Sequence, residues 1–111
     1  MDALSDAVSG LRAAQLQVDV AANNVANVNT PGFEPSVTDQ QAQAGGVVAA
    51  YVAAGQAPPN LPGVPAADQP SGTDLTTEMA ALITGPIAYA ANGRVVDFAV
   101  QNQRSLLDVL A

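Results

Sequence analysis

Three residue types that carry much of enzyme chemistry are missing from this sequence: cysteine, histidine and lysine. Without cysteine there are no disulfides and no thiolate metal sites, and the redox compartment cannot be read. The usual general base near neutral pH, the thiol nucleophile and the Schiff-base amine are also missing, so any catalysis would rest on carboxylates. Asp74 and Glu78 are four residues apart, but a favourable helix start explains them better, since no third acid completes a metal site. We therefore expect no enzymatic activity, no cofactor and no metal ion.

Large apolar side chains and basic residues are also scarce. There is no tryptophan, only four other aromatic residues occur, and the apolar half of the composition is rich in alanine. A chain of 111 residues is at most one small domain, and this one has little surface with which to build a core. Ten acids against three arginines give a formal net charge of -7, which argues against nucleic-acid and anionic-membrane partners.

No segment has the features of a membrane span or a secretory leader. The longest nearly unbroken apolar run, Val47–Ala54, is far shorter than the roughly 20 residues that a spanning helix needs. The first six residues lack the positive charge and apolar core of a signal peptide. We expect no direct membrane span and no cleaved signal peptide.

An amphipathic helix is predicted from about Ala3 to Val28. Its largest apolar residues recur at heptad spacing, which is typical of a coiled-coil seam. The first heptad line contains Leu4, Leu11, Val18 and Val25, and the intervening positions are Val8, Gln15 and Ala22. A second ridge of Ala13, Leu16 and Val20 widens the apolar face, so the helix could touch more than one neighbour.

Four asparagines and a Pro-Gly pair follow this helical pattern. Asn23, Asn24, Asn27 and Asn29 compete for backbone hydrogen bonds and suit a helix end. Pro31-Gly32 fits the central positions of a type II turn. The sequence therefore predicts that the helix ends here and the chain turns.

The middle of the chain, from Glu34 to about Ser71, contains six prolines that exclude a long helix. Two short β-forming stretches, 36–38 and 47–52, could pair as a hairpin around Gly45-Gly46. Residues 57–71 are typical of a polyproline-like connector, a plain spacer unless a partner orders it.

A second amphipathic helix is predicted from near Asp74 almost to Ala111. One heptad line contains Leu75, Leu82, Tyr89, Val96, Gln103 and Leu110, and the other contains Met79, Val100 and Leu107. This helix would be longer than the first, so its end should overhang a hairpin of the two and expose Leu106, Leu107 and Leu110. Gly85-Pro86 predicts a kink or a break between Leu82 and Ile87, because proline removes a donor and clashes with the preceding turn.

The predicted fold class is mainly α, with two long antiparallel terminal helices that form a coiled-coil-like hairpin around a short irregular or β-hairpin middle segment. Three regions are expected: an N-terminal helix and Asn-rich turn over residues 1–30, a variable Gly/Pro/Ala-rich segment over 31–72, and a C-terminal helix over 73–111, kinked near Pro86.

Both ends resemble one known family. The strings GLRAAQ at 10–15 and VDVAANNVANVNTPGF at 18–33 closely resemble the N-terminal signature of the bacterial flagellar basal-body rod family. The run DLTTEMAALIT at 74–84, then AYAAN at 88–92 and the pair Leu106-Leu107, resembles the family's C-terminal signature. Two departures are the short middle and Gly85-Pro86-Ile87, where the family has polar helix formers.

The resemblance implies a structural subunit of the rod whose terminal helices pair in an inner tube. The short middle makes it a small proximal-rod-like subunit or an orphan paralogue, not a distal rod or hook protein. The resemblance also implies export by the flagellar type III apparatus to the periplasmic rod, assembly with other rod subunits, and a role in motility. The asparagines are then either helix-end residues or contacts to the backbone of neighbouring subunits. The expected subunit interface consists of Leu4, Val8, Leu11, Val18, Asn23, Asn24, Val25, Asn27, Leu75, Met79, Leu82, Tyr89, Val96, Val100, Leu106, Leu107 and Leu110.

An alternative function remains open at the level of sequence. The acidic, alanine-rich composition would equally suit a secreted helical-hairpin adaptor that binds a single protein partner without polymerising. The two functions differ in stoichiometry, because a rod subunit repeats one heterologous contact along an axis whereas an adaptor forms a closed complex.

Overall fold

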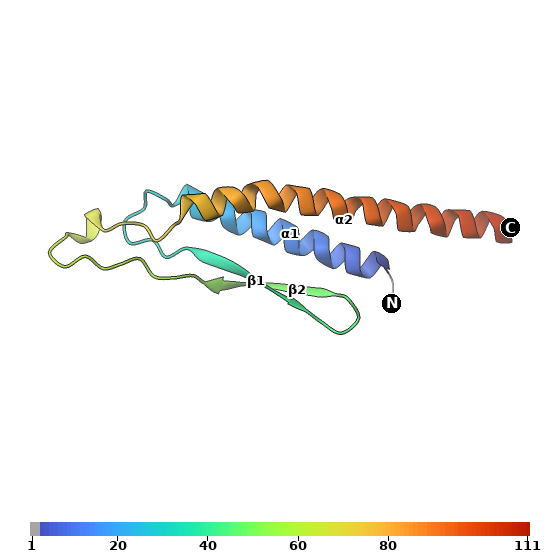
Figure 1. Ribbon diagram of the computed structural model, residues 1–111, viewed down its shortest axis with the longest axis horizontal. Helices are drawn as coiled ribbons and strands as arrows, with labels where there is room; N and C mark the ends of the chain where they lie inside the picture. The colour runs from blue at the N-terminus through green and yellow to red at the C-terminus, as the bar shows by residue number, and fades with distance from the viewer. Residues whose placement is uncertain (1–2) are drawn as a thin grey trace.

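The computed structural model describes residues 3–111 as an elongated hairpin of two helices with a two-stranded sheet beside it. Helix α1 (Ala3–Ala26) and helix α2 (Leu75–Leu110) run antiparallel, and strands β1 (Ser36–Ala42) and β2 (Val48–Ala54) lie along α1 (Figure 1). The molecule measures 76 × 25 × 15 Å, and its radius of gyration of 19.4 Å exceeds the roughly 13 Å of a compact domain of this length. The predicted fold class is confirmed.

Helix α1 ends close to where the asparagines predict. It stops at Ala26, two residues before the expected end, and the Asn27 side-chain amide donates to the carbonyl of Asn23 at 2.9 Å. The backbone N–H of Phe33 donates to the carbonyl of Thr30 at 3.2 Å, and Gly32 has a φ of 67°. This is the type II turn that Pro31-Gly32 predicts, since position three of that turn needs a positive φ.

The middle segment is more ordered than the sequence suggests. The hairpin is real and longer than predicted, with Ser36 paired to Ala54 at one end and Ala42 to Val48 at the other. The two glycines of its turn have φ values of 97° and 85°, which only glycine adopts readily. Strand pairing extends to Gln and Ala positions because α1 supplies a surface for one face of the sheet, a tertiary effect that propensity does not contain.

The connector after β2 is a closed loop, and its description as a plain spacer is corrected. A 3-10 turn, η1 (Ala66–Asp68), lies near its end. The Gln69 side chain accepts from the N–H of Leu61 at 3.0 Å and donates to the carbonyls of Leu61 and Val64 at 3.1 and 2.9 Å. The side-chain amide of Gln69 thus orders the connector from within the chain, without a partner.

Helix α2 begins at the predicted cap. The Asp74 carboxylate accepts from the backbone N–H of Thr76 at 3.1 Å and from the Thr77 hydroxyl at 2.7 Å. The helix then runs unbroken to Leu110 with Pro86 inside it. The helix therefore does not break into two pieces at Gly85-Pro86, and Figure 1 shows one gently curved helix, while the kink near Pro86 stays a prediction. Pro86 is exposed, so water can satisfy the carbonyl that lost its donor.

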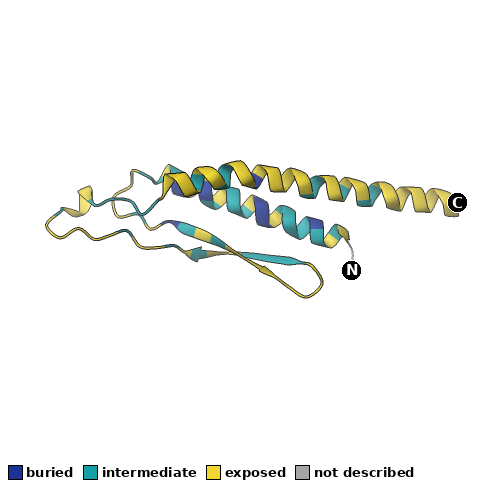
Figure 2. Ribbon diagram, viewed as in Figure 1, coloured by how far each residue is buried: buried dark blue, intermediate teal, exposed yellow. Residues whose placement is uncertain are grey.

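The most buried positions of α1 lie beside the predicted heptad line, which itself reaches α2 at Val18, next to Gly85. The buried positions are Ala7, Ala14 and Ala21, at heptad spacing, with Ala13 and Asn24 beside them (Figure 2). The larger residues of the predicted line, Leu4, Leu11, Val18 and Val25, are only half-buried. Small side chains let the two helix axes approach closely, which is why alanine rather than leucine lies at the contact.

Candidate subunit interface

Two glycines set the distance between the helices. A Cβ placed on Gly85 of α2 would lie 2.5 Å from Cγ2 of Val18 on α1, and one placed on Gly10 of α1 would lie 2.7 Å from Oδ1 of Asn92 on α2. Gly85 is buried. The Gly-Pro pair, which the sequence alone marks as a helix breaker, therefore has a packing role at its glycine.

Asn24 connects three parts of the chain, and its side chain is fully buried. Its amide donates to the Ser36 carbonyl at 2.7 Å and to Oε1 of Glu78 at 2.9 Å, while its Oδ1 accepts from the Ser36 N–H at 2.9 Å. Its backbone carbonyl accepts from the Thr73 hydroxyl at 3.2 Å. This clamp holds the end of α1, the start of β1 and the first turn of α2 in one register.

The other asparagines near the helix end have different environments. Asn23 is exposed, and Asn27 caps α1 from a half-buried position. Asn27 fits the helix-end interpretation, because its amide bonds the carbonyl of Asn23. Asn24 fits neither interpretation, because its amide bonds Ser36 and Glu78 of its own chain, and its side chain has no exposed surface in the single chain.

The end of α2 extends past α1, as the sequence predicts (Figure 1). Val95 lines the same groove as Ala3, the first described residue of α1, so about fifteen residues of α2 lie beyond it. Leu106, Leu107 and Leu110 are exposed over 63%, 68% and 84% of their surface. Together with the rest of residues 96–110 we call this segment the overhang.

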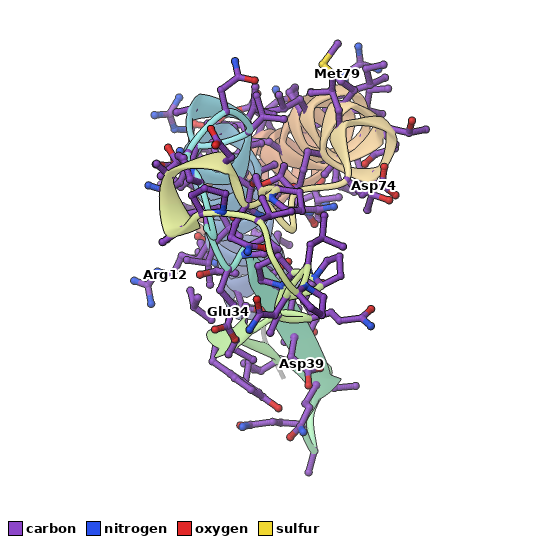
Figure 3. The ribbon with its side chains drawn as sticks, turned by 90° about the vertical axis from the view of Figure 1, so that its left-hand side faces the viewer. Arg12, Glu34, Asp39, Asp74 and Met79 are labelled. Atoms are coloured by element: carbon purple, nitrogen blue, oxygen red, sulfur yellow. The ribbon has the colours of Figure 1, made fainter. Side chains whose placement is uncertain are left out.

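Sequence reasoning missed an apolar stripe on the outer face of α2. Because Gly85 faces α1, Ile83 and Ile87, two residues to either side, point the opposite way. They are 63% and 65% exposed, and Met79 continues the same spacing of four. Figure 3 shows Met79 pointing away from the hairpin. The four-residue spacing of Met79, Ile83 and Ile87 could have predicted this stripe, but Ile83 and Ile87 lie outside the heptad lines that were used to predict the helix contact.

The remaining expected interface residues differ in exposure. Val8 on α1 and Leu82 on α2 are half-buried, as are Val96 and Val100 in the overhang, whereas Leu75 and Tyr89 are exposed. The structure therefore does not gather the predicted set into one surface. It divides the set between the intramolecular contact, the overhang and the outer face of α2.

A groove runs beside the helix contact. Its floor is α1 from Ala3 to Gln17, and its walls are α2 near Ala88 and Asn92 and the hairpin near Gln40 and Val48. The groove has a volume of about 450 Å³. One carboxylate oxygen of Asp6, Oδ1, is buried there without a hydrogen-bond partner among the described residues.

The polar groups of the described residues offer little chemistry. The Tyr51 hydroxyl donates to Asp39 Oδ2 at 2.8 Å, and this bond raises the pKa of Tyr51 above 10.0. Across residues 3–111 no acidic cluster is arranged to hold a metal ion. Within the same residues no helix has both the length and the apolar character to cross a membrane.

Comparison with known proteins identifies the N-terminal segment. Residues 4–33 match the family model described as flagella basal body rod protein. The matched range covers almost all of α1, including Asn24, and the turn that follows. No curated protein matches the chain.

Proposed function

We propose that this chain, which carries the N-terminal segment of the flagella basal body rod protein family, is a structural subunit of the bacterial flagellar basal-body rod. The observation that carries the proposal is the match over residues 4–33, because those residues form the helix on which the rest of the fold is built. The family is structural rather than enzymatic. The short middle segment points to a small, proximal-rod-like member.

Assembly would proceed along the rod axis through the terminal helices. The overhang and the outer face of α2 leave large apolar side chains uncovered, and surfaces of this kind mark contacts with other proteins. The two surfaces differ, so contacts between them are heterologous and can repeat along an axis. The partners would be other rod subunits, reached after type III export to the periplasmic part of the basal body, and the consequence for the cell would be motility.

Isolation of hook-basal bodies tests the proposal. A strain that produces this chain with a short epitope tag should yield washed hook-basal bodies that contain the tag, and deletion of the gene should reduce motility. The matched control is a tagged chain with Leu107→Asp, made in equal amount, which should be exported but missing from the particles. A wild-type chain absent from basal bodies, or found only in a closed complex with a single partner, would contradict the proposal; the second result would support an adaptor.

A further inference from the structure

The outer edge of β2 carries backbone groups that β1 does not use. The N–H of Gly55, just after β2, donates to the carbonyl of Pro35 at 2.8 Å, so these two residues are a hydrogen-bonded pair of the antiparallel ladder. Such pairs alternate with pairs whose N–H and C=O groups point outward. Counting back from Gly55 along the register, the outward groups of β2 include those of Ala54, Val52 and Ala50.

Helix α1 supplies hydrogen bonds to each edge of the hairpin at one place only. The Ser9 hydroxyl accepts from the N–H of Val48, near the turn, and the Asn24 side chain bonds both backbone groups of Ser36, at the open end. The hairpin twists accordingly, with β2 nearer to α1 at the turn and β1 nearer at the open end (Figure 1). Among residues 3–111, the outward groups of β2 beyond Val48 have no hydrogen-bond partner.

The side chains of β2 do not protect this edge. Residues 47–54, VVAAYVAA, contain no charge, no proline and no glycine, although charges and prolines are what usually keep an edge strand from pairing with another chain. Val52 is 50% exposed, and Ala54 is exposed as well. A row of free N–H and C=O groups fits an extended strand, and the apolar side chains favour a strand without charge.

We propose that the β2 strands of two copies of this chain pair antiparallel, edge to edge, about a two-fold axis at Val52. In this register Val52 lies opposite the same residue of the second copy, and Ala50 lies opposite Ala54 of the second copy. Each outward N–H and C=O then has a partner. Tyr51 lies opposite Ala53 of the second copy, so the aromatic ring covers a small side chain. The contact is isologous and joins the two hairpins into one sheet.

The β2 strand of a second copy fits this edge better than its β1 strand. Strand β1 would bring the polar run Asp39, Gln40 and Gln41 against an apolar strand, and one β2 edge would stay uncovered. Residues 47–54 contain none of the ten acids, so two β2 strands meet without direct repulsion despite a net charge of -7 per chain. The contact uses no residue of the overhang or of the outer face of α2, so it does not rest on the proposed function.

Hydrogen exchange on the full chain tests the pairing without a substitution. Sedimentation equilibrium over a series of concentrations should show a dimer, and the same series with Leu107→Asp, which blocks the proposed axial contact, should show the same dimer. Exchange at the N–H groups of Ala50, Val52 and Ala54 should slow about tenfold at concentrations where a tenth of the chain stays monomeric. The N–H of Gln40, which points outward from β1, is the internal control and should exchange at an unchanged rate.

A pair of proline variants places the contact on one edge. Val52→Pro removes an outward donor from each copy and keeps the bonds between β1 and β2, so it should weaken dimerisation about tenfold. Gln40→Pro makes the same change on the other edge and should leave dimerisation unchanged. Circular dichroism should show equal helix content in both variants.

Engineered cysteines give a measurement that does not depend on the proline variants, because the chain has no native cysteine. Copies with Val52→Cys should form a disulfide-linked dimer on mild oxidation, since residues opposed at the axis have Cα atoms about 5.5 Å apart. Copies with Gln40→Cys are the matched control and should stay unlinked under the same conditions.

Several results would overturn the pairing: a wild-type chain that stays monomeric, equal weakening by Gln40→Pro and Val52→Pro, or equal cross-linking of the two cysteine variants. Recovery of the chain in hook-basal bodies while the pure protein remains monomeric would refute this inference and leave the proposed function standing. A dimer paired through β2, formed by a chain that is missing from hook-basal bodies, would do the reverse.

Discussion

Replacing Gly85 by alanine tests whether the close approach of α1 and α2 determines the stability of the fold. A methyl group at this position would lie 2.5 Å from Cγ2 of Val18, whereas ordinary contacts are 3.4–4 Å. Valine is stiff at χ1, so its methyl cannot turn away easily and the helices have to separate. Overpacking of this kind costs about 1–3 kcal/mol.

The same substitution also has a local benefit that must be separated from the clash. Alanine is favoured over glycine inside a helix by about 1 kcal/mol. Gly93→Ala isolates this term, because Gly93 lies in the same helix with no atom within 4 Å of an added Cβ. We therefore expect Gly93→Ala to stabilise the protein by about 1 kcal/mol, and Gly85→Ala to leave it about 1–3 kcal/mol less stable than Gly93→Ala.

Thermal unfolding followed by circular dichroism at 222 nm measures both variants. Trimethylamine N-oxide can be added equally to all samples, since it favours compact states and keeps a weakly stable chain measurable. For a domain of this size 1 kcal/mol corresponds to about 4–8 °C in Tm. Adding Val18→Ala to Gly85→Ala should recover part of the loss, giving a non-additive pair. If Gly85→Ala raises Tm as much as Gly93→Ala does, the helices are not held at this distance and the packing argument is wrong.

Four further outcomes are expected. Asn24→Ala should destabilise the fold by about 1–3 kcal/mol, because it leaves the backbone N–H and carbonyl of half-buried Ser36 without their partner, whereas Asn23→Ala, at an exposed side chain, should change unfolding little; similar losses would contradict the clamp. The pKa of Asp74 lies below its ordinary 3.8 because the Thr77 hydroxyl, and to a smaller extent the backbone N–H of Thr76, donate hydrogen bonds to its carboxylate. The stability that Asp74 contributes as a helix cap is therefore fully present above pH 3.8 and is lost as the pH falls through the lowered pKa. An NMR pH titration should show the start of α2 loosening there, and Asp74→Asn, which still caps, should remove that pH dependence. Leu107→Asp should abolish incorporation into basal bodies without blocking export, and normal motility would remove Leu107 from the interface. Dilute wild-type protein should show weak hydrogen-exchange protection because no large apolar side chain is buried among residues 3–111, and a fully protected monomer would count against this.

Local chemistry alone was enough to predict most of the secondary structure. Apolar periodicity placed both helices, Asp74 marked the start of α2, and Pro31-Gly32 marked the turn, because each of these signals acts over a few residues. The residue counts of the two helices also predicted the overhang, because the length of a helix follows from its residue count.

Which face of α1 becomes buried was decided by the tertiary structure. Heptad spacing predicted a contact along leucine and valine, whereas the buried residues are alanines at the same period, because α2 and the β-hairpin both pack over that side of α1. The role of Gly85-Pro86 was also decided by the tertiary structure. Local propensity predicts that this pair disrupts a helix, but Gly85 packs so close to Val18 that no larger residue fits there.

The amino-acid sequence by itself determined the helices, the turn, the absence of thiol, imidazole and amine chemistry, and the likeness to the rod family. Only the tertiary structure decided that Asn24 is a buried clamp, that Gln69 closes the loop, and that the buried Oδ1 of Asp6 has no hydrogen-bond partner among residues 3–111. The bonds of Asn24 and Gln69 join residues 5 to 54 positions apart, and no local pattern records which of these residues meet in space.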